Sequence, residues 1–260
     1  MLINLNIDKA AEIFANFAYK GVILEMVENG ITGNIFKLSN GAIIASEKYA
    51  NPLVIIAGEL NNAAVQEVIA LINDKENSMI YCAQQYNHLF LPYGWNFHLR
   101  ISFVLDTYRF FPLENGLRVK TIEEYQDFSN CRWYKDTINV YGSHENFIKY
   151  GRGYLLCRED EVLNEIYLYV GGKHAEFNII TNPNYRKKGY GVMLASYVIK
   201  QLLAEGLSPC WSCRADNTAS INTALKLGFK ISNYHIWMVK KYGNVLCKNF
   251  EISPDPDYAI

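Results

Sequence analysis

An excess of charge of either sign is the first thing that the sequence lacks. Its 25 lysines and arginines balance 26 aspartates and glutamates, so the formal net charge at pH 7 is -1. Proteins that bind nucleic acid or an anionic membrane over a broad surface usually carry a basic excess. We therefore expect neither nucleic acid nor a membrane as a partner.

Long hydrophobic runs and dense cysteines are also missing. No apolar run approaches the roughly 20 residues of a membrane span, and residues 1–6 lack the regions of a secretory leader. Six cysteines in 260 residues do not indicate a disulfide scaffold. Cys210 and Cys213 have the C-x-x-C spacing, but a zinc ribbon needs a second pair, and a predicted strand points them to opposite faces. We expect core cysteines, no metal site and a cytoplasmic protein with reduced thiols.

What the chain does have is hydrophobic periodicity. Half of its residues are hydrophobic, which is enough for a sizeable core. In the first part, the spacing predicts helices over 8–28 and 62–73 and strands over 33–38, 41–47, 52–58, 78–83 and 98–106. The segment 112–116 is rich in turn residues. We therefore expect an N-terminal mixed α/β domain over residues 1–115.

The second part, residues 116–260, predicts a different order of elements. After helices at 121–128 and 143–150, we expect strands at 153–157, 162–170 and 174–181, a helix from Gly191 to Gly206, a strand at 207–213, a helix at 217–227 and a strand at 229–240. The strands before and after the first long helix should be parallel neighbours, joined by a right-handed crossover.

A basic loop containing two glycines follows the predicted strand at 174–181. Asn-Pro-Asn at 182–184 ends the strand, and Arg186, two lysines, Gly189 and Gly191 come before the helix. The first turn of a helix has unpaired N–H groups and a positive dipole end, and glycine lets an anion approach the backbone closely. This combination favours a polyphosphate site; the alternative is a solvated basic turn.

Two motifs in this part resemble the GNAT family of N-acetyltransferases. The pattern R-x-x-G-x-G at 186–191 is similar to the acyl-CoA pyrophosphate loop of that family, and N-x-x-S at 217–220 with G-F at 228–229 is similar to a second family motif. The run at 143–153 resembles a subgroup with an extra N-terminal domain, which includes zwittermicin-resistance proteins. The resemblance implies an α+β protein whose residues 116–260 form a GNAT domain with a mixed, mostly antiparallel sheet flanked by helices.

The resemblance also implies a cofactor and a reaction. The cofactor is acetyl-CoA, and its acetyl group would pass directly to a primary amine of a small molecule, in a monomer or a homodimer. In the family, pantetheine lies between two diverging strands and pairs with exposed backbone groups. The cofactor-binding residues are then Ile179, Ile180, Thr181, Arg186, Lys187, Lys188, Gly189, Tyr190, Gly191, Asn217 and Ser220. Asn217 is also in the position of an ordinary helix N-cap, and one residue can both cap the helix and contact the cofactor.

An ammonium acceptor must lose a proton before it attacks, because an amine of this kind has a pKa near ~10. Family members often place a glutamate on the strand before the loop, so we expect Glu176 to be the base, with His174 on the same face as the alternative. The alternative is that Glu176 only orients the substrate or pairs with a cation.

The departing thiolate has no assigned acid. Ala224 stands where many family members carry a tyrosine that protonates the leaving group, and Tyr234 is a candidate substitute. That departure keeps a non-catalytic acyl-CoA sensor as an alternative function, beside a protein or peptide N-acetyltransferase.

Overall fold

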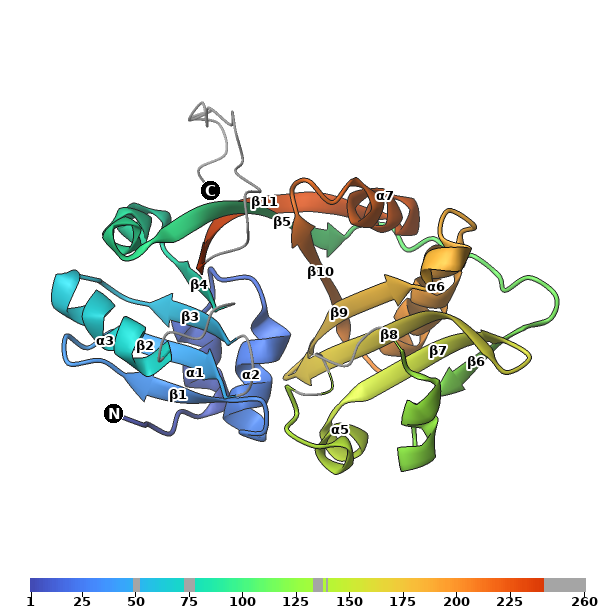
Figure 1. Ribbon diagram of the computed structural model, residues 1–260, viewed down its shortest axis with the longest axis horizontal. Coiled ribbons are helices and arrows are strands. Elements are labelled where there is room, and N and C mark those ends of the chain that lie inside the picture. The colour runs from blue at the N-terminus through green and yellow to red at the C-terminus, as the bar shows by residue number, and fades with distance from the viewer. Residues whose placement is uncertain (49–51, 73–77, 133–137, 139, 241–260) are drawn as a thin grey trace.

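A mixed sheet runs through both halves of the protein (Figure 1). The computed structural model describes residues 1–48, 52–72, 78–132, 138 and 140–240. Within these residues the sheet has 11 strands in the order β1-β2-β3-β4-β11-β5-β10-β9-β8-β7-β6. The strands are β1 (Gly33–Lys37), β2 (Ile43–Glu47), β3 (Leu53–Ala57), β4 (Met79–Cys82), β5 (Trp95–Leu105), β6 (Leu117–Thr121), β7 (Arg152–Arg158), β8 (Glu161–Gly171), β9 (His174–Thr181), β10 (Ser208–Arg214) and β11 (Phe229–Lys240).

Helices pack on this sheet along its length. Figure 1 shows α1, α2 and α3 beside β1 to β4, and α6 and α7 near β9 and β10. The helices are α1 (Ile7–Ile13), α2 (Lys20–Glu28), α3 (Asn62–Ile72), α5 (His144–Tyr150), α6 (Tyr190–Ala204) and α7 (Thr218–Leu227), with 3-10 helices η1 (Gln84–Tyr93), η2 (Tyr125–Asn130) and η3 (Pro183–Tyr185). The expected α+β class, with a mixed and mostly antiparallel sheet flanked by helices, is confirmed: the parallel pairs are β3 with β4 and β9 with β10.

The helix predicted over residues 8–28 is wrong, because two helices stand there. Tyr19 has a φ of 66° and caps the start of α2. This left-handed conformation costs roughly 1–2 kcal/mol for an ordinary residue and cannot continue an α-helix. Between the helices, the rings of Phe14 and Phe17 pack edge to face, with centroids 5.8 Å apart. The break turns α2 toward the rest of the sheet.

The long strand β5 joins the two halves. It pairs antiparallel with β11 on one side and with β10 on the other, and β11 also pairs with β4. Trp95–Leu105 lies within the predicted N-terminal domain, whereas both partners of β5 lie within residues 116–260. The boundary near residue 115 stays a prediction, but hydrogen-bonded sheet crosses it.

The second half follows the expected order from residue 143 onward. Ser143 caps α5 by accepting a hydrogen bond from the N–H of Asn146 at 3.1 Å, and β7, β8 and β9 form the predicted antiparallel meander. The helix predicted at 121–128 is wrong. Residues up to Thr121 belong to β6, and η2 starts only at Tyr125. Leu117 to Lys120 alternate in exposure, which is the period of an edge strand, and this strand extends to Thr121, the first residue of the predicted helix.

Helix α2 lies directly against β8 and β9. Two glycines permit this contact: a Cβ at Gly171 would lie 2.2 Å from the backbone nitrogen of Glu25, and a Cβ at Gly21 would lie 2.9 Å from the carbonyl oxygen of Tyr169. No real side chain tolerates such distances. The N-terminal half of the chain therefore brings the first turn of α2 against the strand that carries Glu176.

Candidate active site

The two parallel strands β9 and β10 separate shortly after they begin. Their pairing covers three residue pairs and ends at Cys210 opposite Glu176. Beyond that point β9 continues to pair with β8 as far as Thr181, and β10 pairs with β5 from Trp211 onward. Within the described pairings, the facing edges of 177–181 and 211–214 have no strand partner. An extended ligand that carries amides can hydrogen-bond to such an open edge.

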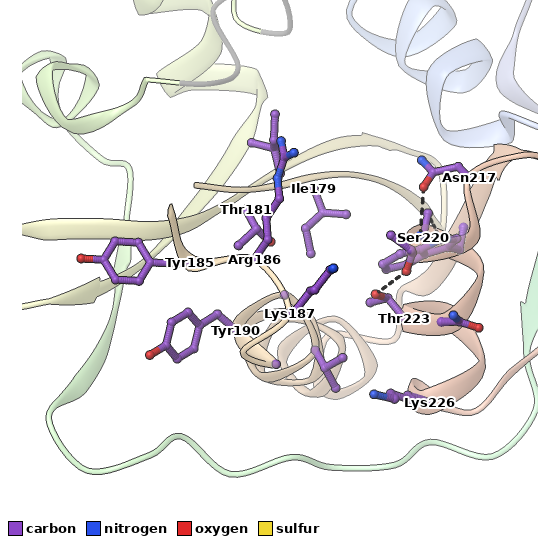
Figure 2. Close-up of a pocket in the computed structure, with 17 residues that line it drawn as sticks. Ile179, Thr181, Tyr185, Arg186, Lys187, Tyr190, Asn217, Ser220, Thr223 and Lys226 are labelled. Atoms are coloured by element: carbon purple, nitrogen blue, oxygen red, sulfur yellow. Dashed lines mark hydrogen bonds between the residues drawn. The ribbon is translucent and has the colours of Figure 1, made fainter. Parts of the chain in front are cut away.

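A cavity of about 490 Å³ occupies this side of the divergence (Figure 2). Strand β9, the loop after it, the start of α6 and one face of α7 form its wall. The lining residues are Ile179, Ile180, Thr181, Tyr185, Arg186, Lys187, Gly189, Tyr190, Gly191, Val192, Trp211, Asn217, Ala219, Ser220, Asn222, Thr223 and Lys226. All of the predicted cofactor-binding residues except Lys188 are among them.

The loop before α6 presents backbone donors to the cavity. Gly189 is the N-cap of α6 and has a φ of 85°, a conformation that suits glycine. The structure gives the N–H groups of residues 187–191 no acceptor among the described residues. Figure 2 shows the side chain of Lys187 pointing across the cavity toward α7. Donors, a helix dipole and a cation thus meet where an anion would be stabilised.

Lys188, by contrast, is not among the residues that line the cavity. Its ammonium lies 4.8 Å from the centroid of the Tyr185 ring, a cation–π contact on the surface. The basic triplet at 186–188 therefore divides into two residues that line the cavity and one that does not.

The far wall is built by the start of α7. Asn217 caps this helix, because its Oδ1 accepts a hydrogen bond from the N–H of Ser220 at 3.1 Å (Figure 2). The Ser220 hydroxyl in turn accepts a hydrogen bond from Nε1 of Trp211 at 3.1 Å. The N-cap reading of Asn217 is confirmed, and its position in the cavity wall leaves the cofactor role open as well.

Glu176 lies at the point where β9 and β10 separate. It is 5 % exposed, and this burial raises the pKa of its carboxyl group to about 7. The N–H of Gly21, in the first turn of α2, donates a hydrogen bond to its Oε1 at 3.4 Å and favours the charged form. A carboxyl group with a pKa near neutrality can accept a proton at physiological pH and release it again.

The alternative base and the candidate acid are placed differently. His174 lies one step away on the same strand face, with Nδ1 3.7 Å from Sγ of Cys210, and burial lowers its pKa. Tyr234 is 56 % exposed on β11 and is absent from the cavity lining. Glu176 and His174 are not among the lining residues either, but the structure brings these two side chains together with Cys210 where β9 and β10 separate, and it leaves Tyr234 apart on β11.

The two cysteines of the C-x-x-C pair, Cys210 and Cys213, lie in different environments. Cys213 is buried in the core under α6 and α7, as predicted. The prediction for Cys210 is wrong: it is only partly buried and faces Glu176 across the strand pair, where burial and the nearby carboxylate raise the pKa of its thiol. Within the described ranges, no cluster of three or more histidine, cysteine or acidic residues is placed to hold a metal ion.

Sequence reasoning missed a cluster beside this site. The guanidinium of Arg100 lies 4.3 Å from the centroid of the Trp237 ring and 5.5 Å from that of Tyr19. The hydroxyl of Tyr19 donates to Oγ of Ser212 at 2.9 Å. One signal was available, because His98, Arg100 and Ser102 alternate with apolar residues and so predict a strand with one polar face.

Comparison of the sequence with known proteins identifies a family. Residues 102–237, slightly more than half of the chain, match the GNAT acetyltransferase family. An uncharacterised N-acetyltransferase of Bacillus subtilis, YdfB, is 30 % identical over 131 residues, or 48 % of this chain and 49 % of that protein. The match thus spans about half the length of this curated relative.

Solved structures extend the likeness to nearly the whole chain. A GCN5-related N-acetyltransferase-like protein from Streptococcus suis aligns with a TM-score of 0.73 at 19 % identity, covering 90 % of this chain and 98 % of that one. A GCN5-related N-acetyltransferase from Kribbella flavida gives 0.59 at 9 % identity, covering 88 % and 98 %. The identities are low, so these structures establish the fold.

The protein belongs to the GNAT acetyltransferase family. Its family implies transfer of an acyl group from an acyl-CoA. None of the helices within the described residues is both long and apolar enough to cross a bilayer.

Proposed function

We propose that the protein transfers an acetyl group from acetyl-CoA directly to a primary amine of a small molecule. One observation carries this proposal: β9 and β10 part at Glu176, and the opening between them leads to the start of α6. A thioester at the inner end of that opening would meet a buried carboxylate, and a diphosphate at its outer end would meet free N–H groups.

The residues present fit acetyl-CoA. The unpaired edge at 177–181 can hydrogen-bond to pantetheine amides, the N–H groups of 187–191 can hold the diphosphate, and Arg186 and Lys187 add positive charge. Asn217 and Ser220 would contact the outer part of the molecule. Bound there, acetyl-CoA supplies the acyl group as an activated thioester.

Glu176 acts as the base in this proposal, either directly or through a water molecule. It takes a proton from the ammonium of the acceptor, and the neutral amine forms a bond to the acyl carbon as the carbon–sulfur bond breaks. The electron pair leaves with the thiolate, which a thiol pKa near ~8.5 makes a fair leaving group, and the second proton of the nitrogen goes to the thiolate or to solvent. His174 remains the alternative base. Because position 224 is an alanine, Tyr234 is the candidate acid, and its exposure on β11 makes it a weak one.

The test is release of free thiol from acetyl-CoA in the presence of a broad panel of amines, with acetylated product identified by mass spectrometry. Turnover with at least one amine is the expected result. Tight acetyl-CoA binding without turnover of any amine would favour the sensor, which the buried Ala224 at the usual tyrosine position keeps as the second candidate.

A further inference from the structure

Buried polar atoms without partners gather on one face of β5 and β11. Within the described residues, Nε of Arg100, Oγ of Ser102, both ring nitrogens of His235 and Nε1 of Trp237 have no hydrogen-bond partner. Arg100 lies directly opposite His235 in the strand pair, and side chains two residues apart share a face. Buried polar groups are almost always satisfied, so five orphan atoms on one face indicate a missing ligand.

Most of these atoms are hydrogen-bond donors, so the missing ligand should be an acceptor. Arginine Nε and tryptophan Nε1 can only donate, and a serine hydroxyl donates as readily as it accepts. Burial, with the nearby charge of Arg100, lowers the pKa of His235 to about 3, so its ring is neutral and offers one further donor. A donor-rich set around a guanidinium matches an anion with several lone pairs.

Arg100 is held in place but not neutralised. Its guanidinium stacks on Trp237 at 4.3 Å, yet it makes no ion pair with any described residue. Arg214, opposite Arg100 in β10, is different, because Asp216 accepts two hydrogen bonds from it at 2.9 and 2.8 Å. A partly buried cation is costly without a counter-charge, and a planar guanidinium fits a carboxylate in two parallel hydrogen bonds.

This anion site adjoins the proposed base. Strand β10 lies between β9, which carries Glu176, and β5, which carries Arg100. Tyr19 connects β5 to β10, since its ring contacts Arg100 and its hydroxyl donates to Ser212. Arg100 is near enough for its charge to lower the pKa of Glu176 against the effect of burial. Their partners on β10, Cys210 and Arg214, lie four residues apart, so a molecule that reaches both residues has to be elongated.

We propose that the acceptor is an amino acid or a related amine that carries its own carboxylate, and that Arg100 binds this carboxylate while the amine faces Glu176. The inference rests on the proposed function and adds the substrate class. Trp237 positions the guanidinium, and His235 and Ser102 donate to the remaining lone pairs.

The experiment uses the full chain and a set of α- and ω-amino acids, each paired with its own carboxamide. Two readouts are collected: kcat/KM for acetyl transfer, and the dissociation constant of each compound for the protein–CoA complex by calorimetry. The variants are Arg100→Gln, Arg100→Lys and the control Arg118→Gln, which removes an exposed arginine of β6 that pairs with Asp160. Circular dichroism checks that each variant is folded.

For at least one amino acid, we expect the wild type to prefer the acid over its carboxamide by tenfold or more. Arg100→Gln should abolish the preference mainly through KM, Arg100→Lys should keep part of it, and Arg118→Gln should keep all of it. The dissociation constant for CoA itself should stay unchanged in every variant.

The outcomes separate the two proposals. An acid preference in binding that Arg100→Gln removes, without any turnover, would support the carboxylate site and contradict the acetyltransferase function. Turnover of amines with no acid preference, or a preference that survives Arg100→Gln, would overturn the carboxylate site. Failure of every acid and every carboxamide to bind or react would also overturn it.

Discussion

Burial of Glu176 is the residue-scale feature that gives the site its chemistry. A carboxyl group with a pKa of about 7 is half-ionised at neutral pH, whereas an exposed glutamate at pKa 4.5 would be too weak a base. The N–H of Gly21 moderates the effect by favouring the ionised form. The environment, more than the residue type, makes Glu176 a base.

The first prediction concerns this carboxylate in catalysis. Glu176→Gln should lower kcat by about a hundredfold or more while the dissociation constant of CoA stays within about twofold. Wild-type kcat should fall below a pH of about 7, as the carboxylate becomes protonated, and the variant should lose that limb of the profile. Glu114→Gln, at an exposed position, is the control. Equal losses in kcat and in CoA affinity would remove Glu176 as the base.

The second prediction concerns the same carboxylate in stability. A folded-state pKa raised from 4.5 to about 7 means that the folded protein binds the proton more tightly than the unfolded chain. The stabilisation is present below pH 4.5 and is lost as the pH rises through about 7. Glu176→Gln should therefore be more stable than the wild type at pH 8.5, by up to about 3 kcal/mol, and similar to it near pH 4.

Urea unfolding at the two pH values checks this prediction. Glu47, whose pKa burial also raises to about 7, adds a similar dependence to both proteins and cancels in the comparison. A variant that is less stable than the wild type at pH 8.5 would show that the charged carboxylate is better satisfied than its burial indicates.

At the scale of elements, substitution of two neighbouring lysines tests whether the loop before α6 binds the diphosphate of CoA. Lys187 lines the cavity, whereas Lys188 lies over the Tyr185 ring. Lys187→Ala should weaken CoA binding by about tenfold, on the order of 1.4 kcal/mol, with little change in kcat at saturation. Lys188→Ala should weaken it by less than about threefold. Calorimetric titration with CoA measures both, and equal losses would contradict the placement of the diphosphate.

Local patterns made this element predictable from the sequence, together with α7. Strand 174–181, the turn at 182–184 and the helix from residue 190 each depend on neighbours in the chain, and the N-cap at Asn217 follows from its own side chain. The break at Tyr19 was not predictable in the same way. It follows from contacts of α2 with β8 and β9, about 150 residues further along the chain.

The same limit applies to the anion site. Arg100 meets Trp237 and Tyr19 because β5 is inserted between β10 and β11, and α2 packs onto the distant strands. Periodicity shows that Arg100 belongs to a polar strand face, but it does not show which strands lie beside it. The phosphate loop, in contrast, is predicted from its own basic residues and glycines, and the base, which lies within 16 residues of it, is predicted from the family resemblance.

At the scale of the whole molecule, the sheet makes the two halves depend on each other. Removing residues 1–115 would take β5 from between β10 and β11, leaving β10 with one unpaired edge and β11 without either of its partners, β4 and β5. It would also remove α2 from Glu176. The cytoplasmic location and the choice between a monomer and a homodimer stay predictions from composition and resemblance.

The fourth prediction follows from this dependence. A fragment of residues 116–260 should fail to fold cooperatively, because exposed strand edges promote aggregation and the core loses the buried side chains of β5. Circular dichroism with thermal unfolding, and size-exclusion chromatography, measure this. A monomeric fragment that unfolds cooperatively and binds CoA would instead confirm an independent domain at the boundary near residue 115.

The central claim is that the opening between β9 and β10 holds acyl-CoA, with its diphosphate on the loop before α6. A crystal structure of the full chain grown with coenzyme A tests this most directly. We predict diphosphate oxygens within hydrogen-bond distance of the N–H groups of residues 187–191, pantetheine alongside residues 177–181, and the thiol near Glu176. Coenzyme A bound elsewhere, or a loop left empty at saturating concentration, would contradict the account.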